Sequence, residues 1–185
     1  MEKRVFDIIF VIFFSPLILV LFFVIFILSF IFNKKHILFF QFRGGLNGEK
    51  IEIIKFRTME DKTKKISSFN NLLRKTRLDE IPQFLNVLKG DLSIVGPRPL
   101  HYEYKDIYSF EQKKRFEVKP GLTGLAQIKD TYSMTWSEQF KIDIWYVENH
   151  NLFLDVKIII KTLFVIIKST GKKEIKDKNK FNGSN

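Results

Sequence analysis

The sequence predicts an α+β protein that associates with a membrane through its N-terminal segment. Residues 5–32 are almost wholly apolar, two later runs have the composition of β-strands around a turn, and most other periodic segments follow helical spacing. The length of 185 residues favours one compact unit with attachments. We therefore divide the chain into a membrane hairpin (1–36), a globular domain ending in an interfacial helix (37–168) and a polar tail (169–185) that is predicted to be disordered.

Composition and charge restrict the classes of function. The formal net charge of +11 indicates an anionic partner. The 21 phenylalanines, many of them in the N-terminal apolar run, favour a membrane surface over nucleic acid, so no nucleic-acid partner is predicted. The chain has no cysteine, which excludes disulfides, thiolate zinc sites and cysteine nucleophiles. Its three histidines, His36, His101 and His150, show no metal-ligand spacing.

The N-terminal apolar run has two interpretations. It exceeds the roughly 20 residues that a straight helix needs to cross a bilayer, so a single spanning helix is one of them. Ser15-Pro16 interrupts the run, and a proline inside a helix removes a backbone hydrogen bond and kinks or breaks the helix. Both flanks, residues 3–4 and 34–36, are basic and therefore prefer the cytoplasmic side. A re-entrant helix–break–helix, which enters and leaves by the same face, satisfies both flanks.

A β-hairpin is predicted after the membrane segment. Residues 37–43 and 51–57 are strand-like, and the Asn47-Gly48 pair between them is a strong turn signal. The second strand brings Lys55 and Arg57 toward the segment that follows.

Short helices and one buried strand come next. Ser67 or Ser68 can cap a helix. Pro82 can open a second helix, which Gly90 ends. Residues 91–95 are interpreted as a short buried strand.

The C-terminal half is predicted to be mainly helical. Residues 111–117 form a charged patch that is interpreted as a solvent-facing side. Thr135 and Glu138 form a capping box that opens a helix with an apolar side. That side carries Phe140, Ile144, Trp145 and Val147. Residues 152–167 are strongly apolar but carry lysines on one helical side, which favours a helix in the membrane interface over a core helix. These lysines are Lys157, Lys161 and Lys168.

Acid, base and proline are concentrated around residues 77–83 (RLDEIPQ). The positive end of a following helix, together with Arg74 and Arg77, would keep a carboxylate ionised. An ionised Asp79 can attack phosphorus and form an acyl phosphate. Glu80 beside it can share a magnesium ion, which binds one or two carboxylates plus substrate phosphates. This combination is typical of a phosphoryl-transfer site.

The sequence Gly96-Pro97-Arg98-Pro99 follows shortly after. Arginines bind diphosphate oxygens through paired N–H groups, and Arg98 has little freedom to lose between two prolines. Each feature also has an ordinary alternative. Acidic residues in the first turn of a helix are common capping groups, and Pro-Arg-Pro is commonly a plain turn. The site is predicted from the co-occurrence of these features with a basic cluster and a membrane segment.

These motifs together resemble the small monotopic phosphoglycosyl transferases of the bacterial sugar transferase family. The resemblance covers nearly the whole chain up to about residue 167, and the motifs occur in the order typical of the family. They are the apolar hairpin with Ser15-Pro16 and the segments 55–59 (KFRTM), 78–83 (LDEIPQ), 92–99 (LSIVGPRP), 119–124 (KPGLTG) and 143–147 (DIWYV). Ile81 replaces the leucine that is commoner before the proline.

The resemblance implies an enzyme that transfers a sugar-1-phosphate from a UDP-sugar to polyprenyl (undecaprenyl) phosphate and releases UMP, with assistance from magnesium. It implies that Asp79 is the nucleophile, that Glu80 is its partner, and that both are placed to hold the metal. The basic residues carried over as phosphate ligands are Arg74, Arg98, Lys55 and Arg57, with Arg77 and Asp143 in supporting positions.

The same resemblance implies a location and a pathway position. The hairpin would be re-entrant, and the catalytic domain would lie on the cytoplasmic face of the bacterial inner membrane. The reaction would be the first membrane step in the biosynthesis of a glycoconjugate, such as a polysaccharide or a glycoprotein.

Two other functions remain open at this point. A non-enzymatic membrane-surface module that binds anionic lipid or nucleic acid would explain the net charge of +11. It would not explain the paired carboxylates among arginines. A phosphatase or nucleotidyl enzyme acting on similar diphosphates is the second alternative, and dependence on polyprenyl phosphate would distinguish it.

Overall fold

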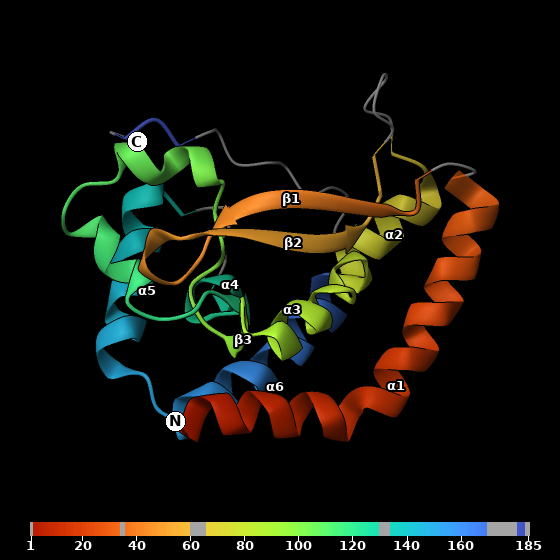
Figure 1. The fold of residues 1–185 in the computed structure, drawn as a ribbon, viewed down its shortest axis with the longest axis horizontal. Helices are drawn as coiled ribbons and strands as arrows, with labels where there is room; N and C mark the ends of the chain where they lie inside the picture. The colour runs from red at the N-terminus through yellow and green to blue at the C-terminus, as the bar shows by residue number, and fades with distance from the viewer. Residues whose placement is uncertain (1, 34–35, 60–65, 130–133, 170–180, 184–185) are drawn as a thin grey trace.

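The computed structural model describes residues 2–33, 36–59, 66–129, 134–169 and 181–183 (Figure 1). The predicted mixture of helices and small sheets is confirmed. The α-helices and strands are α1 (Glu2–Asn33), β1 (Leu38–Gly44), β2 (Lys50–Phe56), α2 (Ser68–Thr76), α3 (Gln83–Lys89), β3 (Ser93–Val95), β4 (Gly121–Thr123), α4 (Leu125–Ile128), α5 (Trp136–Asn149) and α6 (Leu152–Ser169). The 3₁₀ turns within these ranges are η1 (Leu46–Gly48), η2 (Leu78–Glu80), η3 (Tyr102–Ile107) and η4 (Gln112–Phe116).

In the described part of the chain, the β structure consists of two small sheets. β1 and β2 pair antiparallel from Leu38 opposite Phe56 to Gly44 opposite Lys50, so the predicted hairpin is confirmed. Its turn contains Asn47 at φ 53°, in the left-handed region that asparagine tolerates. The second sheet joins the buried strand β3 to β4 in parallel, with Val95 opposite Thr123. This second sheet carries the chain into the segment that contains Arg98.

The N-terminal apolar run forms one helix, α1, with Pro16 near its middle. Figure 1 draws α1 as two arms that meet at an angle. Pro16 has no N–H to donate to the carbonyl of Ile12, and the Ser15 hydroxyl donates to that carbonyl instead, at 2.7 Å. The predicted break is therefore a bend within a continuous helix, because Ser15 replaces the hydrogen bond that proline removes.

The N-terminal end of α1 is fastened to the globular part by polar contacts. Lys3 forms an ion pair with the buried carboxylate of Asp155 at the start of α6. Arg4 donates to the Leu88 carbonyl at 2.6 Å, near the C-terminus of α3. Asp7, which is 1% exposed, accepts hydrogen bonds from the Ser93 hydroxyl and the Ile94 backbone N–H, each at 3.0 Å. Of the predicted basic flanks, the N-terminal one is thus bound to protein, while residues 34–35 lie outside the described ranges.

The C-terminal arm of α1 also returns to the globular part. Phe32 stacks on Phe69 of α2 with ring centroids 4.9 Å apart. Ile25 packs in a buried cluster with Phe56 and Leu73. Both ends of α1 therefore contact the same folded body.

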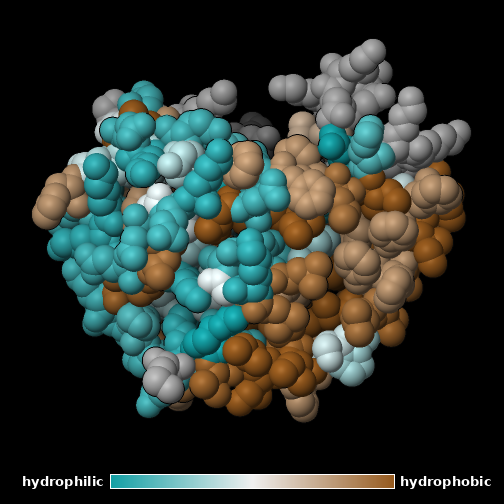
Figure 2. All heavy atoms as spheres, viewed as in Figure 1, coloured by the Kyte–Doolittle hydropathy of each residue, from teal (hydrophilic) through white to brown (hydrophobic). Residues whose placement is uncertain are grey.

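Apolar side chains remain exposed over α1 and α6. Figure 2 shows hydrophobic residues gathered over α1 and the neighbouring part of the fold, with hydrophilic residues over the side that holds α5. Among the described residues, α1 is long and apolar enough to cross a membrane. On α6, Phe153, Phe164 and Ile167 are exposed, whereas Asp155 and Ile158 face the protein. This distribution fits membrane association through α1 and the predicted interfacial helix α6.

Local helix signals are confirmed at several points. Ser67 caps α2 by accepting from the Asn70 N–H, and Gly90 ends α3 at φ 97°. Thr135 and Glu138 form the predicted capping box of α5. Pro82 is the residue immediately before α3, so Asp79 and Glu80 belong to a separate turn, η2, rather than to the helix itself.

Three details differ from the sequence interpretation. The charged patch at 111–117 is not wholly solvent-facing, since Arg115 is 3% exposed. On α5, Trp145 is half exposed and Tyr146 is buried instead. In the tail predicted to be disordered, Phe181 packs among aromatic side chains of η3 and α5, including Tyr104 and Trp136, while residues 170–180 lie outside the described ranges.

Asn86 connects α3 to the hairpin. Its side chain is 3% exposed, accepts from the Ile54 N–H at 3.2 Å and donates to the Glu52 carbonyl at 2.7 Å. It also donates to Asp91 at 3.2 Å. Because Lys55 is the next residue after Ile54 within β2, these bonds set the position of Lys55 relative to the turn before α3.

We predict that Asn86→Ala destabilises the fold by about 2–4 kcal/mol, because the buried Asn86 side chain is lost and two backbone groups of β2 lose their partner. The midpoint of thermal unfolding in detergent should fall by roughly 5–10 °C. Asn149→Ala is the matched control, because the exposed Asn149 only donates to the Trp145 carbonyl one turn earlier. Equal midpoints for the two variants would contradict this role for Asn86.

Candidate active site

The two adjacent carboxylates lie in η2, between α2 and α3. Arg77, immediately before η2, adopts the left-handed conformation at φ 59° and redirects the chain out of α2. Asp79 is 9% exposed, and its Oδ1 is buried with no hydrogen-bond partner among the described residues. The Glu80 side chain is 13% exposed. The turn thus places side by side Glu80, which forms ion pairs, and Asp79, one of whose oxygens has no hydrogen-bond partner among the described residues.

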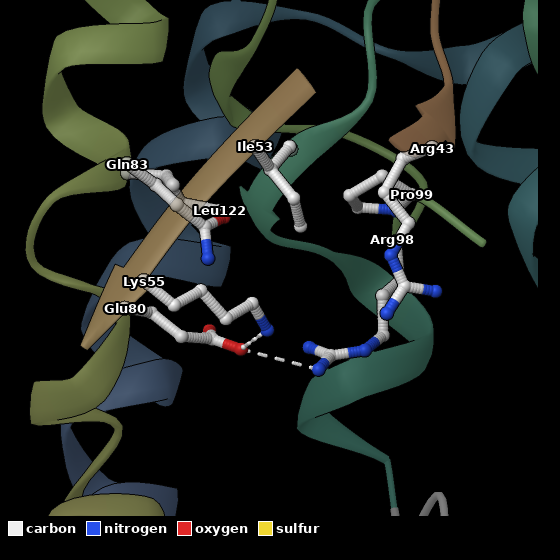
Figure 3. A pocket seen from close by; sticks show the side chains of 9 residues that line it. Arg43, Ile53, Lys55, Glu80, Gln83, Arg98, Pro99 and Leu122 are labelled. Carbon is white, nitrogen blue, oxygen red and sulfur yellow. Dashed lines mark hydrogen bonds and ion pairs between the residues drawn. The ribbon is translucent and has the colours of Figure 1, made fainter. Parts of the chain in front are cut away.

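Glu80 is surrounded by cations (Figure 3). Its Oε1 accepts from Lys55 Nζ at 2.9 Å and from the Arg98 guanidinium at 3.2 Å. Arg77 reaches the same oxygen at 3.7 Å. A charge that is taken out of water needs such partners, because its desolvation would otherwise cost several kcal/mol. The cations come from β2, from the turn before η2 and from the segment after β3.

The environment moves the pKa values of the two carboxyls in opposite directions. Burial first and the neighbouring Glu80 carboxylate second raise the pKa of Asp79 to about 6, against a partial lowering by Lys55, Arg77 and Arg98. Burial alone would raise the pKa of Glu80, but Lys55, Arg98 and Arg77 together hold it well below its ordinary value. Asp79 is therefore mostly ionised at pH 7 and more basic than an ordinary aspartate, while Glu80 stays ionised.

The sequence interpretation expected a helix dipole with Arg74 and Arg77 to keep a carboxylate ionised. Both carboxylates are ionised at neutral pH, but by different balances: cations lower the pKa of Glu80, whereas burial and Glu80 outweigh the nearby cations and raise the pKa of Asp79. Higher basicity increases the nucleophilic strength of a carboxylate that is still ionised at neutral pH.

Arg98 is positioned by close backbone packing. At the ends of β3 and β4, the Gly96 N–H donates to the Thr123 carbonyl and the Gly121 N–H donates to the Pro97 carbonyl, at 2.9 and 3.0 Å. A Cβ placed on Gly121 would lie only 2.1 Å from the Gly96 nitrogen, so only glycine allows this approach.

A buried ion pair supports the Arg98 backbone from behind. The Arg115 guanidinium donates to the Arg98 carbonyl at 2.8 Å and to Asp143 Oδ2 at 2.9 Å. The side chains of Arg115 and Asp143 are each 2% exposed. Asp143, predicted as a supporting residue, therefore acts on Arg98 through Arg115.

The structure brings together only part of the predicted phosphate-binding set. Lys55 and Arg98 line the pocket beside Glu80, and Arg77 contacts Glu80. Arg74 and Arg57 are not among the lining residues. Arg57 instead lies over the Phe39 ring, with its guanidinium carbon 5.3 Å from the ring centroid.

Sequence reasoning missed three residues at or behind the pocket. Arg43 and Gln83 line it, from β1 and the first residue of α3. Arg115 lies behind Arg98. The position of Gln83 directly after the LDEIP segment was a usable signal, whereas nothing local marks Arg43 or Arg115.

The residues present fit a magnesium ion that is completed by substrate. No group of three or more histidine or acidic side chains with metal-binding geometry occurs in the described ranges. Magnesium, however, commonly uses one or two carboxylates together with substrate phosphates. The unpartnered Oδ1 of Asp79, beside the Glu80 carboxylate, supplies such a donor set.

Comparison with known proteins identifies relatives along most of the chain. The family model described as bacterial sugar transferase matches residues 1–169. An uncharacterized sugar transferase of Bacillus subtilis, EpsL, is 43% identical over 145 residues, covering 73% of this chain and 72% of the relative. The UDP-glucose:undecaprenyl-phosphate glucose-1-phosphate transferase of Caulobacter vibrioides is 36% identical over 146 residues, covering 68% of this chain and 55% of that protein.

A third relative has another sugar in its name. The UDP-N-acetylgalactosamine-undecaprenyl-phosphate N-acetylgalactosaminephosphotransferase of Aeromonas hydrophila is 35% identical over 153 residues, covering 73% of this chain and 36% of that protein. Fold, site and relatives together place the chain among membrane-associated transferases. It belongs to the bacterial sugar transferase family, as the sequence motifs predicted.

We predict that Asp143→Leu alone destabilises the protein by about 3–5 kcal/mol, because it leaves the Arg115 guanidinium buried without its carboxylate. Adding Arg115→Met should restore much of the thermal midpoint, since a buried pair replaced by apolar groups is often neutral for stability. A double variant no more stable than Asp143→Leu would show that the pair does not act as a unit.

Proposed function

We propose that this protein transfers a sugar-1-phosphate from a UDP-sugar to polyprenyl phosphate, with release of UMP, through a covalent intermediate on Asp79. The observation that carries the proposal is a pair of adjacent carboxylates with opposed pKa shifts. Glu80 lines a cationic pocket, and the neighbouring Asp79 bears a buried oxygen with no hydrogen-bond partner among the described residues. The names of the Caulobacter and Aeromonas relatives, which join a UDP-sugar to undecaprenyl phosphate, support the choice of donor and acceptor.

In the first step, an Asp79 oxygen attacks the phosphorus that bears the sugar. The bond from that phosphorus to the bridging diphosphate oxygen breaks, and UMP leaves with the bonding electron pair. In the second step, a phosphate oxygen of the polyprenyl acceptor attacks the same phosphorus. The bond to Asp79 breaks, which regenerates the carboxylate and gives the polyprenyl diphosphosugar. Dividing the transfer in this way means that both large substrates need not react at once.

Two cationic side chains and a magnesium ion would assist the phosphoryl group. Lys55 and Arg98 supply positive charge beside Glu80, and their pairing with it keeps both cations in place before substrate arrives. Asp79 and Glu80 would hold a magnesium ion, whose charge would offset that of the diphosphate oxygens.

We further propose that α1 is re-entrant and that the globular part lies on the cytoplasmic face of the bacterial inner membrane. At its N-terminus, Lys3 and Asp7 bind α6 and β3, and at its C-terminus Phe32 stacks on α2. A straight spanning helix would place these ends on opposite sides of the bilayer, since 32 residues at 1.5 Å each extend about 48 Å. The bend at mid-helix removes that conflict.

The proposed reaction predicts continuous, multiple-turnover UMP release that requires a UDP-sugar, polyprenyl phosphate and magnesium. Detergent-solubilised protein should be tested against a panel of UDP-sugars. Asp79→Asn should lose UMP release by at least about 10³-fold, because an amide cannot form the acyl phosphate. Asp106→Asn, a change of the same kind at an exposed aspartate, should retain full activity.

Labelled sugar-phosphate should remain bound covalently to the wild type and to Asp106→Asn when the acceptor is omitted, and not to Asp79→Asn. Equal UMP release by the wild type and Asp79→Asn would contradict a nucleophilic role for Asp79. Continuous UMP release beyond one equivalent per enzyme without polyprenyl phosphate would indicate a hydrolase acting on the same diphosphate.

The raised pKa of Asp79, about 6, predicts the pH dependence of the first step. Below pH 6 the carboxyl is mainly protonated and cannot attack, so the rate of covalent labelling should rise from pH 5 to pH 7 with a midpoint near 6. Single-turnover labelling with quenched samples measures this rate without the second step. A rate independent of pH between 5 and 7 would exclude titration of Asp79 as its cause.

A further inference from the structure

Arg43 is a partly buried cation at the pocket, and the proposed reaction has not yet given it a function. It lies near the end of β1 and lines the pocket with Lys55, Glu80 and Arg98 (Figure 3). Lys55 and Arg98 both pair with Glu80, whereas Arg43 makes no ion pair within the part of the chain that the structure describes. Its guanidinium donates to the Gln41 side-chain oxygen, and its Nε is buried with no partner among the described residues.

Backbone contacts hold Arg43 close to Arg98. Arg43 forms an isolated antiparallel bridge with His101, and the Gly44 N–H donates to the Leu100 carbonyl at 3.1 Å. These contacts tie the end of β1 to the segment that follows Arg98. Burial first and the adjacent Arg98 second lower the pKa of Arg43 to about 10, so it remains charged at neutral pH.

The lining residues of the pocket therefore carry three cations, Arg43, Lys55 and Arg98, and one carboxylate, Glu80. Two guanidinium groups placed close together repel each other, and an anion between or beside them removes that cost. A diphosphate has two phosphoryl groups, and Arg98 is the guanidinium that contacts Glu80, next to Asp79 in the chain. We therefore expect the phosphoryl group that Asp79 attacks to lie beside Arg98. The second phosphoryl group of the diphosphate would then lie beside Arg43.

We propose that Arg43 binds the nucleotide-side phosphate of the UDP-sugar and stabilises the charge that develops on departing UMP. The catalytic role of Arg43 rests on the proposed function. Its binding of the nucleotide-side phosphate can be tested independently of catalysis. A guanidinium is suited to it, because its planar N–H groups can bond two phosphate oxygens at once. Because UMP leaves before the acceptor reacts, Arg43 acts in the first step only.

The test measures the affinity of the full-length protein in detergent for UDP, UMP and uridine by titration calorimetry. Arg43→Gln should weaken both UDP and UMP about 10- to 100-fold, the range expected when a charged hydrogen bond is lost, and leave uridine unchanged. Arg43→Lys should lie between the wild type and Arg43→Gln. Lys50→Gln is the control, since Lys50 belongs to the same hairpin, lies over the Phe42 ring and does not line the pocket.

A kinetic experiment separates the two steps. Arg43→Gln should slow covalent labelling from the UDP-sugar about 10- to 100-fold at saturating donor. Once labelled, it should pass the sugar-phosphate to polyprenyl phosphate at the wild-type rate. Unchanged UMP affinity in Arg43→Gln would overturn the proposal, as would an equal slowing of both steps. Loss of UDP and UMP affinity without any transfer by the wild type would uphold Arg43 as a phosphate ligand and refute the proposed function instead.

Discussion

The site depends on keeping two neighbouring carboxylates ionised in a poorly solvated turn. Glu80 is tolerated there because Lys55, Arg77 and Arg98 converge on one of its oxygens. Each cation has to be delivered by a different part of the fold, and much of the architecture serves that purpose. Asn86 fastens α3 to β2, which carries Lys55. The parallel pairing of β3 with β4 places Arg98.

The membrane segment belongs to the same scheme. Asp7 of α1 accepts hydrogen bonds from Ser93 and Ile94 of β3, the strand that leads to Arg98. The apolar helix is thus a structural neighbour of the site and not only an anchor. Its polar residues lie at the ends and at the bend, where Ser15 compensates for the hydrogen bond that Pro16 cannot make.

Local signals predicted much of this structure. The Asn47-Gly48 turn, the Ser67 cap and the Thr135–Glu138 box each act within a few residues, and each was predicted correctly. Motifs placed the carboxylate pair, Lys55 and Arg98 at one site, because these residues lie in segments with recognisable composition. The ion pairs of Lys55 and Arg98 with Glu80 were not predicted.

What sequence reasoning missed depends on distant partners. Arg115 is in a charged run that looks solvated, and it is buried because Asp143, 28 residues later, pairs with it. Arg43 is placed at the pocket by the antiparallel bridge between Arg43 and His101, which joins β1 to a segment distant in sequence. Arg74 is the opposite case, because it was predicted to bind phosphate and lies close to the carboxylates in sequence. The left-handed Arg77 turns the chain between α2 and η2, and Arg74 does not line the pocket.

The shared cations also affect how variants of this site can be interpreted. Lys55 and Arg98 lower the pKa values of both Asp79 and Glu80, in addition to their proposed role as phosphate ligands. Replacing either one is therefore expected to alter the ionisation of Asp79, the proposed nucleophile, as well as the attraction for an incoming phosphate. A single substitution of Lys55 or Arg98 is therefore expected to change two quantities together: the pKa values of the carboxylates and the affinity of the site for phosphate. A second, compensating substitution is therefore needed to replace one of these cations without also changing the acid–base balance of the carboxylates.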